Sequence, residues 1–379
     1  YLGANKDFTP MSMNMSTHAM NYGSWADWDW LKANVPVMCN WDGGIDYFLD
    51  PDDYTKKADG TNSDAANIDY AGDAMAIVKK IYKKEYKVGN DRYVYFCERK
   101  VDDDFHAVGF NVLGKERDYM LIPMFYGSID SNGKMRSIAG QWSCLTASGS
   151  AADNATGKAI GTAEQYTAIQ AASSKALFFG GALTNTLADI CILLSKSTDS
   201  QTAFGSGMCS TYVEDKTQHY GTKINTVIGG GQFYGSNDNK SFNKIFHSCV
   251  MGSYMLWQRD PYMLLINGRI KVSPDYTYDL TGAKYLDTGV NLAKNGYYAT
   301  TQVVKDFGAV PNDEIACSSA TGYCDHTWVN AEITAVSLRF GACHNGAADG
   351  LWARALYFVA ASAWWTYGAS KLLPAPAAA

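Results

Sequence analysis

The sequence is short of charge, and this shortage excludes one large class of protein. Asp, Glu, Lys and Arg together make up 18% of the 379 residues, and the formal net charge is −6. No basic stripe of the kind that nucleic-acid binding requires appears along the chain. Because nucleic-acid binding depends on clustered Lys and Arg, we expect no nucleic-acid partner.

Long uninterrupted apolar runs are also missing. The most apolar stretch, residues 176–194, is broken by Gly180, Gly181, Asn185 and Asp189. A helix that spans a bilayer needs about 20 consecutive, predominantly apolar residues. We therefore expect no insertion into a membrane.

Motifs for catalysis and metal binding are scarce as well. The nine cysteines include no CxxC pair, the six histidines form no HExxH, and neither a P-loop nor a GxSxG is present. The acidic clusters 50–53 and 102–104 lack the spacing of a calcium-binding EF-hand loop. We expect no metal, no cofactor and no enzymatic activity. An odd number of cysteines cannot all pair within one chain, which favours buried thiols in a protein made in a reducing cytoplasm.

Aromatic residues are plentiful where charge is scarce. Tyr, Trp and Phe make up 13% of the chain, and 35 glycines accompany them. Antibody paratopes use a similar combination of large aromatic and small flexible residues for molecular recognition. The composition therefore favours a loop-rich protein that binds other molecules through its surface.

The middle of the chain mixes strand and helix patterns. Residues 92–99 and 118–126 are aromatic and β-branched, which predicts strands, whereas 74–82 fits a strand and a helix about equally well. A capping-box spacing at Thr162–Gln165 predicts a helix to about residue 173. A second helix is expected from about residue 184, where Leu187, Ile190, Cys191 and Leu194 form one apolar face.

The residues from Gly350 to Phe358 are predicted to form a strand near the C-terminus. Trp352, Arg354 and Leu356 would lie on one face and Ala355 and Tyr357 on the other, so that one row faces the core and one faces outward. The alternative from patterning alone is an ordinary edge strand whose aromatic side chains pack inward.

Several segments resemble a known family. They are Glu116–Met120, Asp130–Lys134, Thr162–Tyr166, Asp199–Gly207, Gly350–Leu356 and Trp364–Ser370. Together they are similar to the C-type-lectin-like proteins of phage tails, and the likeness extends over about residues 74–373. The C-terminus resembles the variable region of proteins diversified by a diversity-generating retroelement, in which a reverse transcriptase miscopies adenines.

The resemblance implies an α+β fold: a C-type-lectin-like domain with two helices and a small antiparallel sheet. It would occupy residues 91–373, with a variable region at 339–367. A loop- and strand-rich, aromatic-rich N-terminal portion, residues 1–90, would precede it, and a short tail, residues 374–379, would follow. Calcium-dependent sugar binding is not expected even in this fold, because the Glu-Pro-Asn and Trp-Asn-Asp motifs of true lectins are absent.

The resemblance also assigns residues to recognition. Asn positions of the relatives correspond to Ala355, Tyr357, Phe358, Ser362 and Thr366, and an Asn codon reaches each of these residues by changes at its two adenines. Arg339, His344 and Asn345 are further expected ligand contacts. Trp352, Trp364, Trp365 and Gly368 are expected to form the scaffold.

The function implied is ligand or receptor binding through a hypervariable surface on a phage or prophage tail tip. The expected localisation is the virion tail or a cell surface, after synthesis in the bacterial cytoplasm. The expected partner is a host-cell surface protein or glycan, and the chain is a candidate homo-oligomer. One alternative is a structural virion component without diversified binding.

The second alternative is an enzyme. The lectin-like fold also hosts formylglycine-generating enzymes, which use a cysteine pair, and Cys317 and Cys324 are the nearest candidates although their spacing differs from that family's motif. Cys324 and His326 would share one face of a strand. A Cys–His nucleophile also needs a third group to orient the base, and the sequence offers none.

Overall fold

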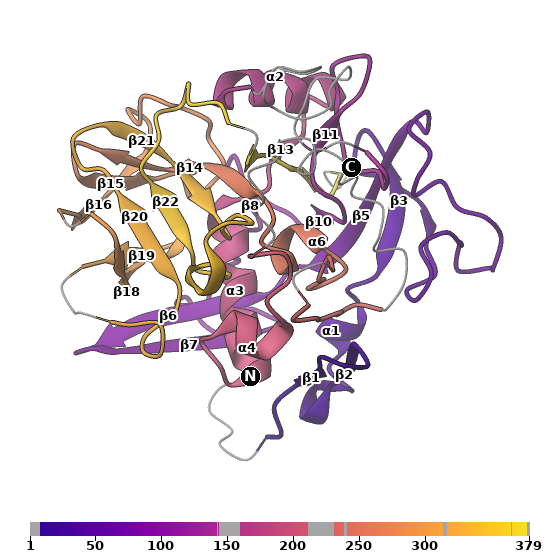
Figure 1. Ribbon diagram of the computed structural model, residues 1–379, viewed down its shortest axis with the longest axis horizontal. Coiled ribbons are helices and arrows are strands. Elements are labelled where there is room, and N and C mark those ends of the chain that lie inside the picture. The colour runs from indigo at the N-terminus through magenta and orange to yellow at the C-terminus, as the bar shows by residue number, and fades with distance from the viewer. Residues whose placement is uncertain are drawn as a thin grey trace.

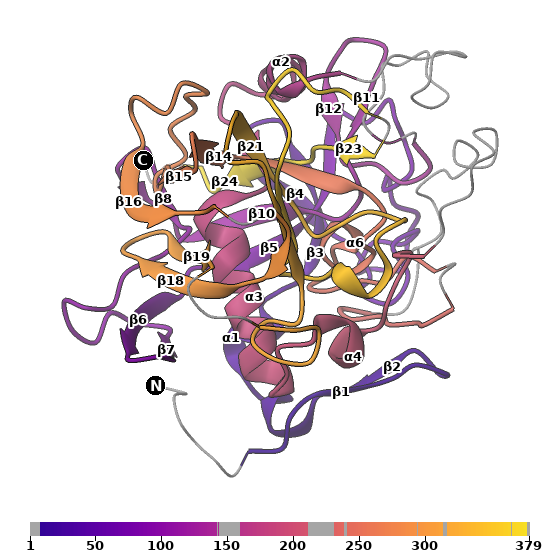
Figure 2. The ribbon, with the colours of Figure 1, turned by 60° about the vertical axis from the view of Figure 1, so that its left-hand side comes forward.

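The computed structural model of the protein describes residues 8–141, 143, 160–210, 231–238, 241–293, 295–313, 317–364 and 366–376. Within these ranges the chain is mostly β-structure, arranged around two large sheets with one long helix between them (Figures 1 and 2).

The first sheet has six antiparallel strands that come from distant parts of the chain. Their spatial order is β13 (Leu177–Phe178), β24 (Lys371–Pro374), β10 (Tyr119–Pro123), β5 (Gly72–Lys79), β3 (Pro36–Asn40) and β4 (Ile45–Phe48). The C-terminal strand β24 therefore lies inside the sheet, between β13 and β10, so the sheet is complete only when the end of the chain is in place.

The second sheet has eight strands and is curled. Its main path is β16 (Leu286–Asn291), β15 (Arg269–Val272), β14 (Trp257–Ile266), β21 (Thr334–Arg339), β22 (Arg354–Leu356), β20 (His326–Val329) and β17 (Tyr297–Tyr298). The eighth strand, β23 (Tyr367–Gly368), pairs with the start of β14 in parallel. Only two residues separate β23 from β24, so the last strands of the chain join the two sheets.

Short hairpins and helices surround the sheets. The hairpins are β1 (Ser12–Asn14) with β2 (Ala19–Asn21), β6 (Tyr82–Val88) with β7 (Asp91–Cys97), β8 (Asn111–Val112) with β9 (Lys115–Glu116), β11 (Ser128–Ile129) with β12 (Met135–Arg136), and β18 (Thr300–Val304) with β19 (Gly308–Asn312). The α-helices are α1 (Asp29–Lys32), α2 (Thr162–Ala172), α3 (Gly181–Ser195), α4 (Ser200–Phe204) and α6 (Cys249–Gly252); the 3-10 turns are η1 (Gly23–Trp25) and η2 (Gly346–Ala348). Within the described ranges, no helix has the length and apolar character needed to cross a membrane.

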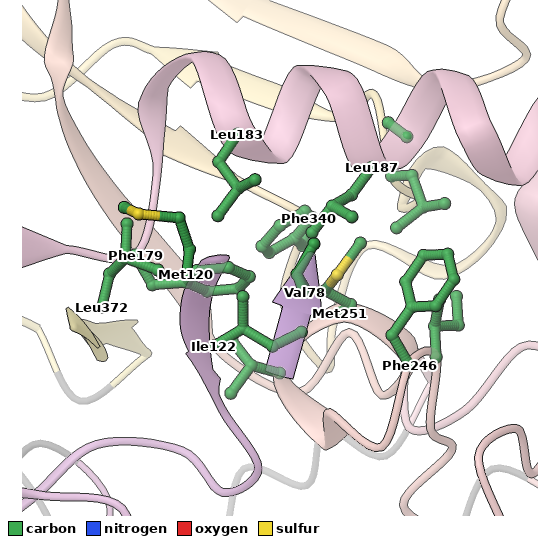
Figure 3. Packing of buried hydrophobic residues seen from close by; sticks show 14 of the residues in the cluster. Val78, Met120, Ile122, Phe179, Leu183, Leu187, Phe246, Met251, Phe340 and Leu372 are labelled. Carbon is green, nitrogen blue, oxygen red and sulfur yellow. The ribbon is translucent and has the colours of Figure 1, made fainter. Parts of the chain in front are cut away.

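Helix α3 is the centre of the hydrophobic core. Figure 3 shows Leu183 and Leu187 of this helix packed close to Val78, Met120 and Ile122 of the six-stranded sheet. All five side chains are almost completely buried. Burial of each such side chain contributes about 1.5–3 kcal/mol, so the helix and the sheet stabilise each other.

The structure overturns the expected fold class. A small two-helix α+β lectin domain does not describe a chain that is mostly β, with a curled eight-stranded sheet beside a six-stranded one. The expectation was wrong because it was built from local patterns and short motifs. Several pairings that build the two large sheets, such as β10 with β24 and β14 with β21, join segments far apart in the sequence, and local periodicity contains no information about such pairing.

Individual elements match the sequence expectations more closely. The two expected strands correspond to β7 and β10, and the segment with the ambiguous pattern is strand β5. Helix α2 starts at Thr162 as predicted, but its N-cap is Gly161, whose amide donates to the Glu164 carboxylate at 2.8 Å. Helix α3 begins three residues earlier than expected, at Gly181, whose amide donates to the carboxylate of Asp260.

A buried polar cluster connects the N-terminal loops to the segment before α6. The Lys244 ammonium donates to the Tyr54 hydroxyl at 3.0 Å, and that hydroxyl lies 2.7 Å from Nδ1 of His247. All three residues are at most 2% exposed. Burial lowers the pKa of Lys244 to about 7 and also lowers the pKa of His247.

This cluster predicts that Lys244 makes the protein more stable as the pH rises from about 7 to about 8.5, where the cysteine thiols of the unfolded chain begin to ionise. Between these values the unfolded chain binds a proton at Lys244 that the folded chain largely does not, so the free energy of unfolding increases by on the order of 2 kcal/mol. Urea unfolding across this pH range should show the increase in the wild type and its loss in Lys244→Met. Parallel pH profiles for the two proteins would contradict the prediction.

Candidate ligand-binding site

A hollow of about 220 Å³ opens at one end of the eight-stranded sheet. Strands β14, β20, β22 and β23 and the loops that follow β21 and β22 all contribute to it. Its lining residues are Trp257, Trp328, His344, Asn345, Ala355, Tyr357, Phe358, Trp364, Thr366 and Tyr367. Six of these ten residues are aromatic, and Asp, Glu, Lys and Arg are absent from the set.

The floor of the hollow is fixed by strand pairing. Trp328 of β20 lies opposite Ala355 of β22, and Ala355 in turn lies opposite Leu338 of β21. The Trp257 and Trp328 rings meet edge to face, with centroids 5.5 Å apart and planes at 89°. Because Ala355 has only a methyl group, it leaves open the space between these rings and the rim.

The rim consists of aromatic side chains on the loop after β22. The Tyr357 and Phe358 rings are 5.3 Å apart, and Phe358 contacts Tyr367 at 4.7 Å. Tyr357 is 38% exposed and Trp364 is 48% exposed. Large apolar side chains that stay this exposed beside a hollow are typical of binding surfaces.

His344 and Asn345 form the opposite part of the rim. The Asn345 side-chain amide donates to the Asp349 carboxylate at 2.9 Å, and the same carboxylate oxygen accepts from the backbone amide of Ala342 at 3.2 Å. These bonds hold the loop in a fixed conformation while His344 remains exposed. Burial raises the pKa of Asp349.

A buried ionic cluster lies beneath the hollow, on the opposite face of the same strands. Arg339 of β21 and Arg354 of β22 both donate to the Asn185 side-chain oxygen of α3, at 3.0 and 2.7 Å. Their guanidinium groups lie 3.7 and 3.6 Å from the Asp260 carboxylate. Burial lowers the pKa of both arginines, and for Arg339 the neighbouring guanidinium of Arg354 lowers it further.

Six of the eight residues expected to contact ligand line the hollow: His344, Asn345, Ala355, Tyr357, Phe358 and Thr366. The other two do not. Arg339 is fully buried in the ionic cluster, because on a strand it faces the side opposite to Leu338. Ser362 lies outside the lining, and its carbonyl oxygen accepts a hydrogen bond from the Arg259 guanidinium.

The residues expected to form the scaffold differ in where they lie: some are buried and one is on the rim of the hollow. Trp352 is buried against Tyr323 at 4.4 Å, and Gly368 is buried in β23. Trp364, in contrast, is on the rim of the hollow. Trp365 lies outside the described residues.

Three lining residues were not anticipated from the sequence: Trp257, Trp328 and Tyr367. Trp257 and Trp328 are distant from the C-terminal segment in sequence and reach it only through pairing of β14 and β20 with their neighbours. The only available signal was that an aromatic residue stood in a strand-like segment. Tyr367 is adjacent to the predicted Thr366, so proximity alone would have found it.

The cysteines considered for the enzyme alternative have unfavourable surroundings. Burial raises the pKa of both Cys317 and Cys324, and a protonated thiol is a poor nucleophile. Cys324 contacts the Thr198 hydroxyl at 3.7 Å, whereas His326 packs against the rings of Tyr298 and Trp328. The eight cysteines that the structure describes are all thiols, and among the described residues no three His, Cys, Asp or Glu side chains gather as metal ligands would.

A larger hollow, of about 770 Å³, lies elsewhere, between β6 and the β18–β19 turn. His106 Nδ1 lies 2.8 Å from the Asp306 carboxylate at its edge, and Asp104 is paired with Lys84 at 2.6 Å. None of the residues predicted from the sequence lines it. We favour the aromatic hollow as the candidate site because six of the residues expected to contact ligand line it, although it is the smaller of the two.

Comparisons with protein-family models and with curated proteins find no match to this chain. The case for a function therefore depends on the residues and the geometry described above.

The buried ionic cluster predicts that replacing Asp260 by an uncharged side chain of the same shape strongly destabilises the fold. Asp260→Asn keeps the shape of the side chain but removes the carboxylate that lies nearest to two buried guanidinium groups. The free energy of unfolding should fall by about 3–5 kcal/mol, as measured by urea denaturation.

Asp287→Asn is the matched control. Asp287 forms an exposed ion pair with Arg269 at 2.6 Å, and its loss should cost less than about 1 kcal/mol. Similar losses in the two variants would contradict the importance of the buried cluster.

Proposed function

We propose that the protein recognises ligands through the aromatic hollow and its rim, and that it presents this surface to a molecule on a host cell, as a phage or prophage tail-tip protein does. The observation that supports this most directly is that residues from separate segments meet at one place. Six residues that the sequence assigns to recognition, at positions 344, 345, 355, 357, 358 and 366, line the same hollow.

The geometry also suits a surface that changes between relatives. Along β22, Arg354 faces the buried ionic cluster and Ala355 faces the hollow. Tyr357 and Phe358 follow after the strand has ended, and the hydrogen bond that links Phe358 to β21 uses its backbone carbonyl, which accepts from the Val336 amide at 3.0 Å. Substitution at the outward positions leaves the hydrogen bonds of Arg339 and Arg354 intact, which favours diversification without loss of the fold.

Sequencing the 3′ end of the gene across its source population tests this proposal. We expect substitutions concentrated in the codons for the lining residues His344, Asn345, Ala355, Tyr357, Phe358 and Thr366, at the positions where the template has adenine. Codons for Arg339 and Arg354 should be constant, since both side chains are buried in the ionic cluster. A near-identical template and a reverse-transcriptase gene should lie nearby.

Substitutions spread evenly along the gene, with no template at the locus, would overturn the diversified surface. The structural virion component would then be the better account, and the exposed rings of the rim would be contacts with a neighbouring subunit.

A further inference from the structure

The larger hollow, of about 770 Å³, lies between the hairpins β6–β7 and β18–β19 (Figures 1 and 2). Residues 83–86 of β6 line one side of it, and residues 303–306 and Gly308 line the other. Its volume is within the range of about 300–1,000 Å³ that is typical of ligand sites. Strands β6 and β18 belong to different sheets, so the direction of their backbone amides and carbonyls decides what can bind between them.

Glu85 and Lys87 of β6 direct their backbone groups away from β7. Lys83 exchanges two backbone hydrogen bonds with His106, at 2.8 and 3.0 Å, so its own amide and carbonyl face away from β7. Backbone groups of successive residues alternate between the two edges of a strand, so Glu85 and Lys87 face the same side as Lys83. Among the described residues, no other segment forms a backbone hydrogen bond with Glu85 or Lys87 on that edge.

Thr301 and Val303 of β18 direct their backbone groups toward β6. The Thr301 carbonyl accepts a hydrogen bond from Nζ of Lys87 at 3.0 Å. The residue opposite Thr301 on β19 is Pro311, which has no amide to donate. By the same alternation Val303 also faces β6, and within the described ranges no other segment forms a backbone hydrogen bond with it on that side. Two strand edges with unpaired backbone groups therefore face each other across the larger hollow.

Two contacts set the length over which these edges are open. At one end Lys87 binds the Thr301 carbonyl, and at the other end Nδ1 of His106 lies 2.8 Å from the Asp306 carboxylate. Between Lys83 and Lys87 strand β6 rises by about 13 Å, at about 3.3 Å per residue. An extended chain of three or four residues spans this length.

The backbone groups, and not the charges, distinguish between ligands here. Acidic and basic side chains of the lining pair with one another: Lys83 with Glu85, Lys84 with Asp104, and His106 with Asp306. Donors and acceptors alternate along both facing edges. An extended peptide has matching donors and acceptors on both of its own edges, at the same spacing. This match favours a peptide main chain over other classes of ligand.

We infer that the larger hollow binds an extended peptide segment of a partner protein, which inserts as a strand and pairs with both β6 and β18. The result is one continuous sheet of five strands, in which the peptide lies between the two hairpins. Main-chain hydrogen bonds supply most of the affinity in this mode of recognition, so the peptide sequence matters little. The site is separate from the aromatic hollow, and the inference does not depend on the proposed function.

Hydrogen exchange of individual amides, followed by NMR, tests the inference with the peptide N-acetyl-Val-Thr-Val-Thr-amide. A short peptide should bind weakly, with a Kd on the order of 1 mM. In the free protein the amides of Glu85, Lys87 and Val303 should exchange rapidly, because they have no partner strand. Near-saturating peptide should slow their exchange at least tenfold. The amide of Val94, which faces the opposite edge of the same hairpin, should be unaffected.

A peptide methylated at the nitrogens of both valines shows whether both edges are used. Methylation removes the donors from one edge of the peptide and leaves its side chains unchanged. A peptide that pairs with one strand only can turn its methylated edge to the solvent and still bind. A peptide between two strands cannot, so we expect binding to fall at least tenfold. Equal binding of the two peptides would overturn the inference, and this comparison needs no protein variant.

Val303→Pro removes the outward amide of β18 and should weaken protection of Glu85 and Lys87 at least fivefold. Proline is tolerated on a strand edge where the amide is not paired, so the unfolding midpoint should change little. Val94→Pro, which removes the corresponding amide from the outer edge of β7, is the matched control and should leave protection unchanged. No protection by the peptide, or protection in peptide-free protein that increases with protein concentration, would overturn the inference. The second result would mean that another copy of the chain fills the hollow.

Discussion

The structure around the hollow depends on one buried interaction, the hydrogen bonds between Asn185 of α3 and the two arginines Arg339 and Arg354. Adjacent strands β21 and β22 are thereby attached to the helix that forms the centre of the core. The nearby Asp260 carboxylate also accepts the Gly181 amide at the start of α3. Because unpaired buried charges are costly, this arrangement defines one register for the strands and fixes the floor of the hollow.

Because side chains alternate along a strand, the residues that stabilise the fold and the residues beside the proposed binding site lie on opposite faces of β21 and β22. On β21 and β22, Arg339 and Arg354 face the helix, while Leu338 and Ala355 face the aromatic cluster. The rim residues lie just beyond the strand ends. A binding surface of this kind can change its chemistry without changing its scaffold, since Arg339 and Arg354 are hydrogen-bonded to α3 whereas Leu338 and Ala355 pack in the aromatic cluster.

Individual strands and helices could be predicted from the sequence, whereas the pairing of distant strands into two sheets could not. Strand β10 and the start of α2 followed from composition and capping, and the expected contact residues from His344 to Thr366 were assigned through the family resemblance of the C-terminal segment. The fold class was wrong because β24 pairs with β10 across most of the chain, and no local pattern specifies such a partner. Arg339 was assigned to the ligand because it starts the variable segment, although strand alternation turns it inward.

The central claim is that the outward residues of this segment are independent of the fold. The most direct measurement compares two display libraries by resistance to protease. One library is randomised at His344, Tyr357 and Phe358, and the other at Arg339, Arg354 and Leu356. The account predicts that most members of the first library fold and that few members of the second do. Equal loss of folded protein in both libraries would contradict it.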